Sequence, residues 1–181
     1  MKGVARKSIA VLVGICLFIA LSMAAVNMIT APRIAEQEEI AKKNALNAVL
    51  PENEDFDLFK PTEAQQQTIP ECVKEIWVDK DGDGVVAILS VKGYDSSKPM
   101  SIAVGFSSLG SIDKVVIISA NGETSGIGTK VKNSDFIAQF DGKDNELVGV
   151  DTISGATVSS SAVINAVKDS FIVCELIKGE S

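Results

Sequence analysis

Residues 73–120 read VKEIWVDKDGDGVVAILSVKGYDSSKPMSIAVGFSSLGSIDKVVIISA. Four segments of this stretch are rich in valine and isoleucine, which favour β-strands because their branched side chains suit a pleated surface. These segments are residues 73–78, 84–92, 101–107 and 114–120. Glycine, aspartate, serine and proline separate them, as in the turns of a strand meander. We therefore predict a sheet of largely antiparallel strands.

A helix is predicted to follow the strands, over residues 158–177. Its apolar residues recur at steps of three and four, which places them on one face of a helix. They are Val163, Ala166, Val167, Phe171, Cys174 and Ile177. A shorter helix or turn is expected at 136–140. A strand meander followed by a packed helix is an α+β pattern, and we assign it to a domain over 73–181.

The N-terminal segment is predicted to cross a membrane. Residues 9–29 read IAVLVGICLFIALSMAAVNMI, with only Ser22 and Asn27 strongly polar. A helix of this length spans about 30 Å, the thickness of the hydrocarbon core of a bilayer. The alternative is a cleaved signal peptide with its site near residues 22–24. The apolar run continues past that site and exceeds the usual ~7–15 residues of a signal peptide, which favours a retained anchor.

Charge predicts the orientation of this anchor. Three of the 17 basic residues, Lys2, Arg6 and Lys7, precede it, and all 24 acidic residues lie at Glu36 or beyond. Positive flanks stay in the cytoplasm, so we expect a single-pass protein of the cell (inner) membrane with an extracytoplasmic domain. Pro32 is predicted to close the segment 1–32. Residues 33–72 then read as an amphipathic helix that continues from the anchor and is ended by Pro51, followed by an acidic, irregular connecting stretch.

Composition excludes several kinds of chemistry. The chain beyond residue 32 carries a net charge of −10, which disfavours binding to nucleic acid. No histidine is present, which removes Ser-His-Asp catalysis, histidine-ligated zinc and haem with an axial histidine. Three cysteines without CxxC spacing disfavour an iron–sulfur or zinc site within one chain. We expect no catalytic or metal-binding residues of those kinds, and Cys72 and Cys174 remain open between a disulfide and two thiols.

Three polar, glycine-containing segments are candidates for binding sites. The first, DKDGDG at 79–84, partly matches a calcium-binding loop. Its twelfth position is Ser90 in place of the usual glutamate, so a hairpin turn is favoured. The second, GETSGIGTK at 122–130, has glycines that let backbone N–H groups approach a ligand. Its Lys130 is suited to an anionic or carbonyl group.

The third segment, DTISGAT at 151–157, leads into the predicted C-terminal helix. The first N–H groups of a helix lack intrahelical partners and carry a partial positive charge, so this position suits a phosphate. The alternative is an ordinary helix cap made by Ser154 or Thr157. Taken alone, this segment does not decide between the two interpretations.

Together these segments resemble a known family. DTISGAT resembles the flavinylation motif D-x-x-[ST]-G-A-[ST] of FMN-binding domains in Rnf and Na⁺-translocating quinone reductase complexes. ETSGIG at 123–128 resembles the E-T-P-G-L-G loop of those domains, with Ser125 and Ile127 as departures, and KGY at 92–94 resembles their G-Y element. The order, the spacing and the anchor agree over nearly the whole chain. Its compact length is more similar to the G subunits of Rnf complexes than to the longer C subunits of the quinone reductases.

The resemblance implies a set of site residues. Thr157 would carry FMN through a phosphoester bond that a separate flavin transferase forms from FAD. Asp151, Ser154, Gly155 and Ala156 would belong to the sequence that this transferase recognises. The loop of the second segment would lie against the flavin ring or its ribityl tail. The loop residues concerned are Glu123, Thr124, Gly126 and Gly128.

The resemblance also implies a function, since a flavin supplies redox chemistry that these side chains lack. The chain would be an electron-transfer subunit of an Rnf-type complex that couples ferredoxin–NAD electron transfer to Na⁺ or H⁺ transport. Its partners would be the other subunits, and it would not act as an enzyme on its own. Three alternatives remain at this point: a quinone-reductase subunit, a stand-alone extracytoplasmic flavoprotein shuttle, and an anchored binding domain without redox activity.

Overall fold

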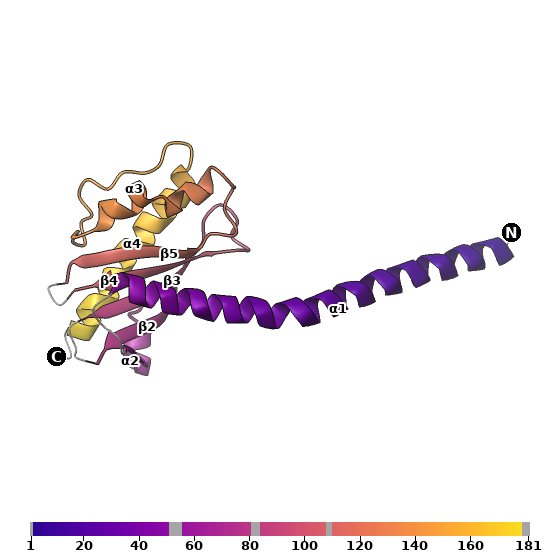
Figure 1. Cartoon of the computed structure of the whole chain (residues 1–181), viewed down its shortest axis with the longest axis horizontal. Helices are drawn as coiled ribbons and strands as arrows, with labels where there is room; N and C mark the ends of the chain where they lie inside the picture. The colour runs from indigo at the N-terminus through magenta and orange to yellow at the C-terminus, as the bar shows by residue number, and fades with distance from the viewer. Residues whose placement is uncertain (1, 51–55, 81–83, 108–109, 179–181) are drawn as a thin grey trace. The chain divides into compact units, whose positions relative to one another are not determined.

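The computed structural model describes residues 2–50, 56–80, 84–107 and 110–178 of the chain (Figure 1). The chain divides into two compact units, residues 1–41 and 42–181, which are treated separately below. Helix α1 (Lys2–Val49) supplies the first unit and the first residues of the second. The second unit holds the sheet and all other helices that the structure describes.

The first unit is a continuous helix with an apolar, exposed surface. An 18-residue window within Ile9–Val49 has a mean hydropathy of 2.8 and no buried residues, so length and composition suit a membrane span. Helix α1 continues through Pro32 without a break, into the helix that was expected to follow the anchor. Proline removes one helical hydrogen bond, and helix-forming residues on both sides explain why this loss does not end the helix. The helix ends at Val49, two residues before Pro51, as predicted.

The second unit is built on a five-stranded antiparallel sheet in the order β1-β2-β3-β4-β5. The strands are β1 (Phe56–Leu58), β2 (Val73–Asp79), β3 (Val85–Val91), β4 (Met100–Phe106) and β5 (Ile112–Ser119). The last four confirm the predicted segments. Strand β1 lies in the acidic stretch that was predicted to be irregular, and three residues are too few to show a strand pattern.

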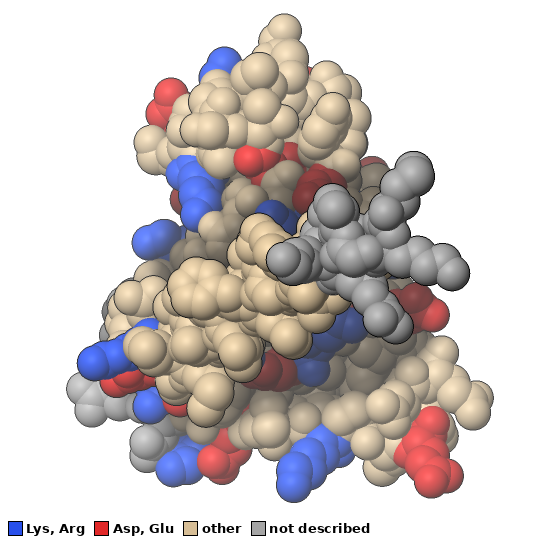
Figure 2. All heavy atoms as spheres, turned by 90° about the vertical axis from the view of Figure 1, so that its right-hand side faces the viewer, with Lys and Arg blue, Asp and Glu red and all other residues tan. Residues whose placement is uncertain are grey.

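Both faces of the sheet are covered, which explains the uninterrupted apolar sequences of β3 and β4. One face packs on helix α4 (Thr157–Lys178), which lies across the sheet in Figure 1. The other face packs on the end of α1 within the second unit, where Leu46 and Val49 contact Val86 and Ala103. The sheet with α4 confirms the predicted α+β class. Figure 2 shows basic and acidic side chains interspersed on one face of the molecule.

Gly105 permits the close contact between the end of α1 and the sheet. A Cβ atom at this position would lie 1.9 Å from Cγ1 of Val49, which is fully buried. An ion pair adds to this contact, because Lys42 Nζ lies 2.5 Å from Glu75 Oε1. Trp77 Nε1 donates to the other oxygen of Glu75 at 3.2 Å. Both charged side chains are partly exposed, so packing contributes more than this pair does.

Helix α4 buries the predicted face. Five of the six predicted residues are buried in the core, and Ile177 packs against it partly exposed. The rings of Phe171 and Phe106 meet edge to face at 5.0 Å, which joins α4 to β4. The chain between β5 and α4 contains η1 (Gly128–Lys132), α3 (Ser134–Ile137) and η2 (Ala138–Phe140), as expected for a short helix or turn near 136–140. Helix α2 (Glu63–Gln66) precedes β2.

The DKDGDG segment connects two antiparallel strands, as the hairpin interpretation requires. The N–H of Asp79 donates to the carbonyl of Gly84 at 2.9 Å, directly at the ends of β2 and β3. Ser90, the twelfth position of the calcium-loop alignment, lies within β3. Residues 81–83 of the motif lie outside the described part of the chain.

Cys72 and Cys174 are free thiols in this structure. Burial raises the pKa of both thiols above the ordinary value of 9.0, and Asp169 raises that of Cys72 further. In the unfolded chain both thiols ionise near pH 9, whereas in the folded protein they stay protonated to higher pH. The stability that depends on them is therefore complete below pH 9 and decreases as the pH rises further.

We expect the free energy of unfolding to fall more steeply between pH 8 and 10 in the wild type than in a Cys72→Ala/Cys174→Ala variant. Denaturant titrations followed by the fluorescence of Trp77, the chain's one tryptophan, measure this difference. Equal slopes in the two proteins would show that burial does not disfavour the thiolates.

Candidate functional site

The start of α4 is shaped by a turn at residues 153–156. Gly155 has a φ of +80°, a backbone conformation that favours glycine, and no atom lies within 4 Å of where its Cβ would be. The N–H of Ala156 donates to the carbonyl of Ile153 at 2.9 Å. Ser160 Oγ accepts from the N–H of Ile153 at 3.1 Å and donates to the carbonyl of Ala156 at 2.9 Å. Ser160 therefore ties the turn to the helix from within α4.

The Thr157 hydroxyl makes no helix-capping hydrogen bond within the described residues. Thr157 is the first residue of α4, it is exposed, and its hydroxyl has no hydrogen bond to the described residues; the same is true of the Ser154 hydroxyl. The backbone N–H groups of 157–159 also find no acceptor in the described part of the chain. A free hydroxyl beside three free N–H groups at the positive end of a 22-residue helix suits an anion.

The loop after β5 is folded tightly on itself. Gly126 has a φ of +74°, and its N–H donates to Thr129 Oγ1 at 2.9 Å. The carbonyl of Thr124 accepts from the N–H groups of Ile127 and Thr129 at 3.1 and 3.2 Å. Gly126 is exposed, and a Cβ there would meet no atom within 4 Å, so this side of the loop is open to a ligand.

Glu123 joins the loop to the other segments of the site. It is 7% exposed, unlike most carboxylates, and it forms no ion pair with a described residue. One carboxylate oxygen accepts from the N–H of Tyr94 at 2.9 Å, and the other accepts from Ser159 Oγ through a short hydrogen bond. The segments 92–94 and 123–128 and the first turn of α4, which directly follows DTISGAT, therefore form a junction at this one side chain.

Two hollows border this junction. The first, of about 560 Å³, is lined by residues 94–97 and 122–124. The second, of about 870 Å³, includes Lys92, Pro99, Val158 and Ser161 in its lining. The apolar or aromatic side chains of Tyr94, Ile127 and Val158 are 71%, 48% and 60% exposed. The junction thus offers both apolar surface and an anion site.

Of the remaining predicted residues, Gly128 lies beside Glu123, whereas Lys130 and Asp151 are on the exposed surface. Gly128 is buried, and a Cβ there would lie 2.5 Å from Glu123 Oε2 and 3.0 Å from Ser159 Oγ. Lys130 is exposed and forms no ion pair within the described chain. Asp151 is also exposed, and its N–H donates to Gln139 Oε1 at 2.7 Å.

Two serines in the first turns of α4 were not anticipated from the sequence. Ser159 and Ser160 are buried at 3% and 0% exposure, whereas most serines are exposed. The run of three serines at 159–161, at the start of an amphipathic helix, is the available signal. It shows that hydroxyls are present without showing which of them turn inward.

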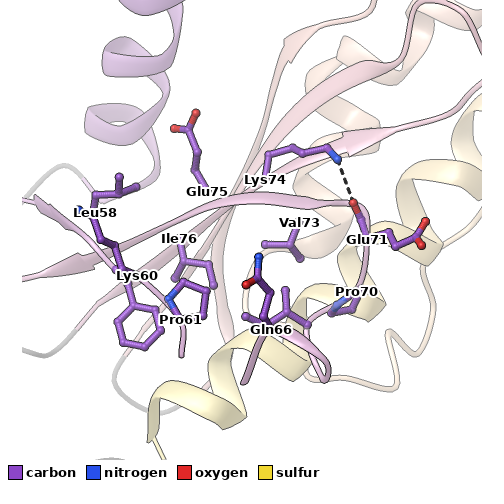
Figure 3. Close-up of a pocket in the computed structure, with 12 residues that line it drawn as sticks. Leu58, Lys60, Pro61, Gln66, Pro70, Glu71, Val73, Lys74, Glu75 and Ile76 are labelled. Atoms are coloured by element: carbon purple, nitrogen blue, oxygen red, sulfur yellow. Dashed lines mark hydrogen bonds between the residues drawn. The ribbon is translucent and has the colours of Figure 1, made fainter. Parts of the chain in front are cut away.

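A third hollow lies beside β1, β2 and α2 and contains none of the predicted residues (Figure 3). Its volume is about 430 Å³, and apolar side chains such as Phe59, Ile69 and Ile76 line much of it. At its rim, Lys74 Nζ donates to the carbonyl of Glu71 at 3.1 Å. Glu75 is already bonded to Lys42 and Trp77. The hollow therefore presents no set of groups suited to catalysis or cofactor binding.

Comparison with known families agrees with this arrangement. Residues 93–171 match the model of the FMN-binding domain, and residues 1–49 match that of the RnfG N-terminal region. In both regions the chain is similar to RnfG proteins. The FMN-binding match begins at Gly93 and ends at Phe171, so it contains every segment of the junction described above. These matches support membrane-associated electron transfer with FMN.

Two relatives are each named as the G subunit of an ion-translocating oxidoreductase complex. The protein from Shewanella piezotolerans is 28% identical over 176 residues, covering 81% of this chain and 78% of the relative. The protein from Methanosarcina acetivorans is 29% identical over 139 residues, covering 73% of this chain and 72% of the relative. The likeness to these RnfG proteins thus extends over most of both chains.

Proposed function

We propose that this chain is a membrane-anchored electron-transfer subunit that carries FMN covalently, through a phosphoester on Thr157 Oγ1. The proposal rests on the exposure and the hydrogen bonding of the Thr157 hydroxyl. This hydroxyl is exposed and unbonded within the described chain, and it stands beside three free N–H groups at the start of α4. A phosphoester retains one negative charge, which the helix N-terminus stabilises.

The residues around Thr157 fit the remaining parts of FMN. The N–H groups of 157–159 would hold the phosphate. The open sides of Gly126 and Gly155 leave room for the ribityl chain, and the exposed surfaces of Tyr94, Ile127 and Val158 suit a flat aromatic ring. When bound, the flavin supplies the one- and two-electron chemistry that these side chains lack.

Attachment is expected to require a separate flavin transferase with FAD as the donor. In that step Thr157 Oγ1 forms a bond to the FMN phosphorus, the phosphoanhydride bond of FAD breaks, AMP leaves, and the hydroxyl proton passes to a base. No described residue lies within hydrogen-bonding distance of the Thr157 hydroxyl to act as that base. This supports a role for an external enzyme that recognises the exposed segment 151–157.

The chain is further proposed to work beside the other subunits of an Rnf-type complex. The names of both relatives, which refer to one subunit of an ion-translocating complex, support this. Ferredoxin–NAD electron transfer coupled to Na⁺ or H⁺ transport is the reaction proposed for the whole complex. Three basic residues before the apolar segment support an N-terminus in the cytoplasm and a domain on the opposite side.

Fluorescence of the denatured chain tests the proposal. The full chain is produced with and without a flavin transferase, separated on a denaturing gel and illuminated with ultraviolet light. We expect a fluorescent band only when the transferase is present, because denaturation releases any flavin that is not covalently bound. A dark band in cells where another substrate of the transferase is labelled would contradict the proposal.

A further inference from the structure

We propose that Glu123 is a positioning residue, which holds the start of α4 and the two neighbouring loops in the arrangement that Thr157 needs to receive the flavin. The inference rests on the function proposed above. It differs from the sequence-based expectation that Glu123 lies against the flavin, because the residue is 7% exposed and both oxygens of its carboxylate are bonded within the protein.

The geometry joins Glu123 to Thr157 by a short path. Ser159, whose hydroxyl donates to Glu123, lies two residues after Thr157 in the first turn of the same helix. The other oxygen of Glu123 fixes the backbone of Tyr94, which follows β3. One side chain thus links three segments that are far apart in sequence, the chain after β3, the loop after β5 and the first turn of α4.

Two glycines of the site are explained by this carboxylate. A Cβ at position 93 would lie 1.8 Å from Glu123 Oε1, and a Cβ at position 128 would lie 2.5 Å from Oε2. Neither contact is possible while the carboxylate stays in place. Gly93→Ala is therefore a way to displace the Glu123 side chain without changing it. Apart from atoms of Glu123, the nearest atom to the added Cβ would be Cε of Met100, at 3.1 Å, and this side chain is flexible.

Hydrogen bonds, and not ion pairs, join Glu123 to Tyr94 and Ser159. Both donors, a backbone N–H and a hydroxyl, are neutral, and no described cation forms an ion pair with Glu123. Glutamine has the same shape. Its Oε1 accepts from Tyr94 and its Nε2 donates to Ser159 Oγ once that hydroxyl rotates to accept. Alanine removes both bonds and leaves the hydroxyl of buried Ser159 without this partner.

The test measures the initial rate of flavin incorporation into the full chain by a flavin transferase with FAD. We expect Glu123→Gln to stay within about twofold of the wild type. We expect Glu123→Ala to be slower by about tenfold or more, because small displacements of reacting groups have effects of this size or larger. Glu146→Ala, at an exposed glutamate in a loop, is the matched control and keeps the wild-type rate. The visible circular dichroism of the attached flavin provides a second readout.

A double variant separates positioning from a general loss of structure. Gly93→Ala is expected to slow incorporation as Glu123→Ala does, and to add no further slowing in the Glu123→Ala background, where its clash is absent. Trp77 fluorescence shows which variants are folded. If Glu123→Ala does not fold, the initial rates of flavin incorporation into Ser159→Ala and Gly93→Ala test the positioning role instead.

The outcomes are distinguishable. Slowing by Glu123→Ala and Gly93→Ala that is not additive, with recovery in Glu123→Gln, supports the role of Glu123. A labelled wild type whose folded Glu123, Gly93 and Ser159 variants incorporate flavin at unchanged rates overturns this inference and leaves the proposed function standing. A wild type that takes up no flavin overturns the proposed function, and the positioning role with it.

Discussion

Replacing Thr157 by alanine is expected to abolish covalent flavin completely while the domain stays folded. The side chain is exposed and its hydroxyl bonds to no described residue, so its loss costs little stability, within about 0.5 kcal/mol for a surface position of this kind. Alanine also favours the helix. The loss of flavin therefore reports on the attachment atom itself. Gel fluorescence measures attachment, and Trp77 fluorescence during denaturation confirms folding.

Two variants make this result specific. Thr152→Ala removes another exposed threonine from the same motif and should keep full labelling, because residue 152 is outside α4. Thr157→Ser keeps a hydroxyl at the same place and should keep labelling at a reduced or equal rate. Full labelling of Thr157→Ala would place the flavin on another residue and contradict the proposed role of Thr157.

Replacing Phe106 by alanine is expected to produce the largest loss of stability, about 3–5 kcal/mol. Phe106 is fully buried between the sheet and α4, and its ring meets Phe171 edge to face at 5.0 Å. The variant loses the transfer free energy of the ring, the aromatic contact of about 0.5–1.5 kcal/mol, and leaves a cavity that the rigid sheet cannot close. Because α4 carries Thr157, the same change loosens the site.

Denaturant unfolding of the full chain in detergent micelles, followed by Trp77 fluorescence, measures this loss. Val148→Ala is the matched control: its side chain is 68% exposed, so we expect a change within about 0.5 kcal/mol. Equal stability of the Phe106→Ala variant and the wild type would show that the contact between β4 and α4 does not hold the domain together.

The sequence predicted those parts of the fold that have a long or periodic pattern. Strands β2 to β5 have runs of seven or eight residues with clear turns between them, and α4 has an apolar face that repeats over about four turns. Strand β1 has three residues, and pairing with β2 defines it more than its own composition does.

The candidate site could be predicted as a set of segments, but not as a geometry. Motifs placed Thr157 at a helix start, and the structure has it there. They did not distinguish a cap from a free hydroxyl, because Ser160, which ties the preceding turn to α4, comes after the motif. Nor did they show that Glu123 turns inward, since that depends on Tyr94 and Ser159, which lie 29 and 36 residues away in sequence.

The most direct test of the account is mass spectrometry of the chain produced with a flavin transferase and digested with trypsin. Cleavage after Lys143 and Lys168 releases residues 144–168, which contain Thr152, Thr157 and the serines at 154 and 159–161. We predict that this peptide gains the mass of FMN less one water, and that fragment ions place the gain on Thr157. An unmodified peptide, or a gain on another residue, in a preparation where the transferase is active would contradict covalent attachment at Thr157.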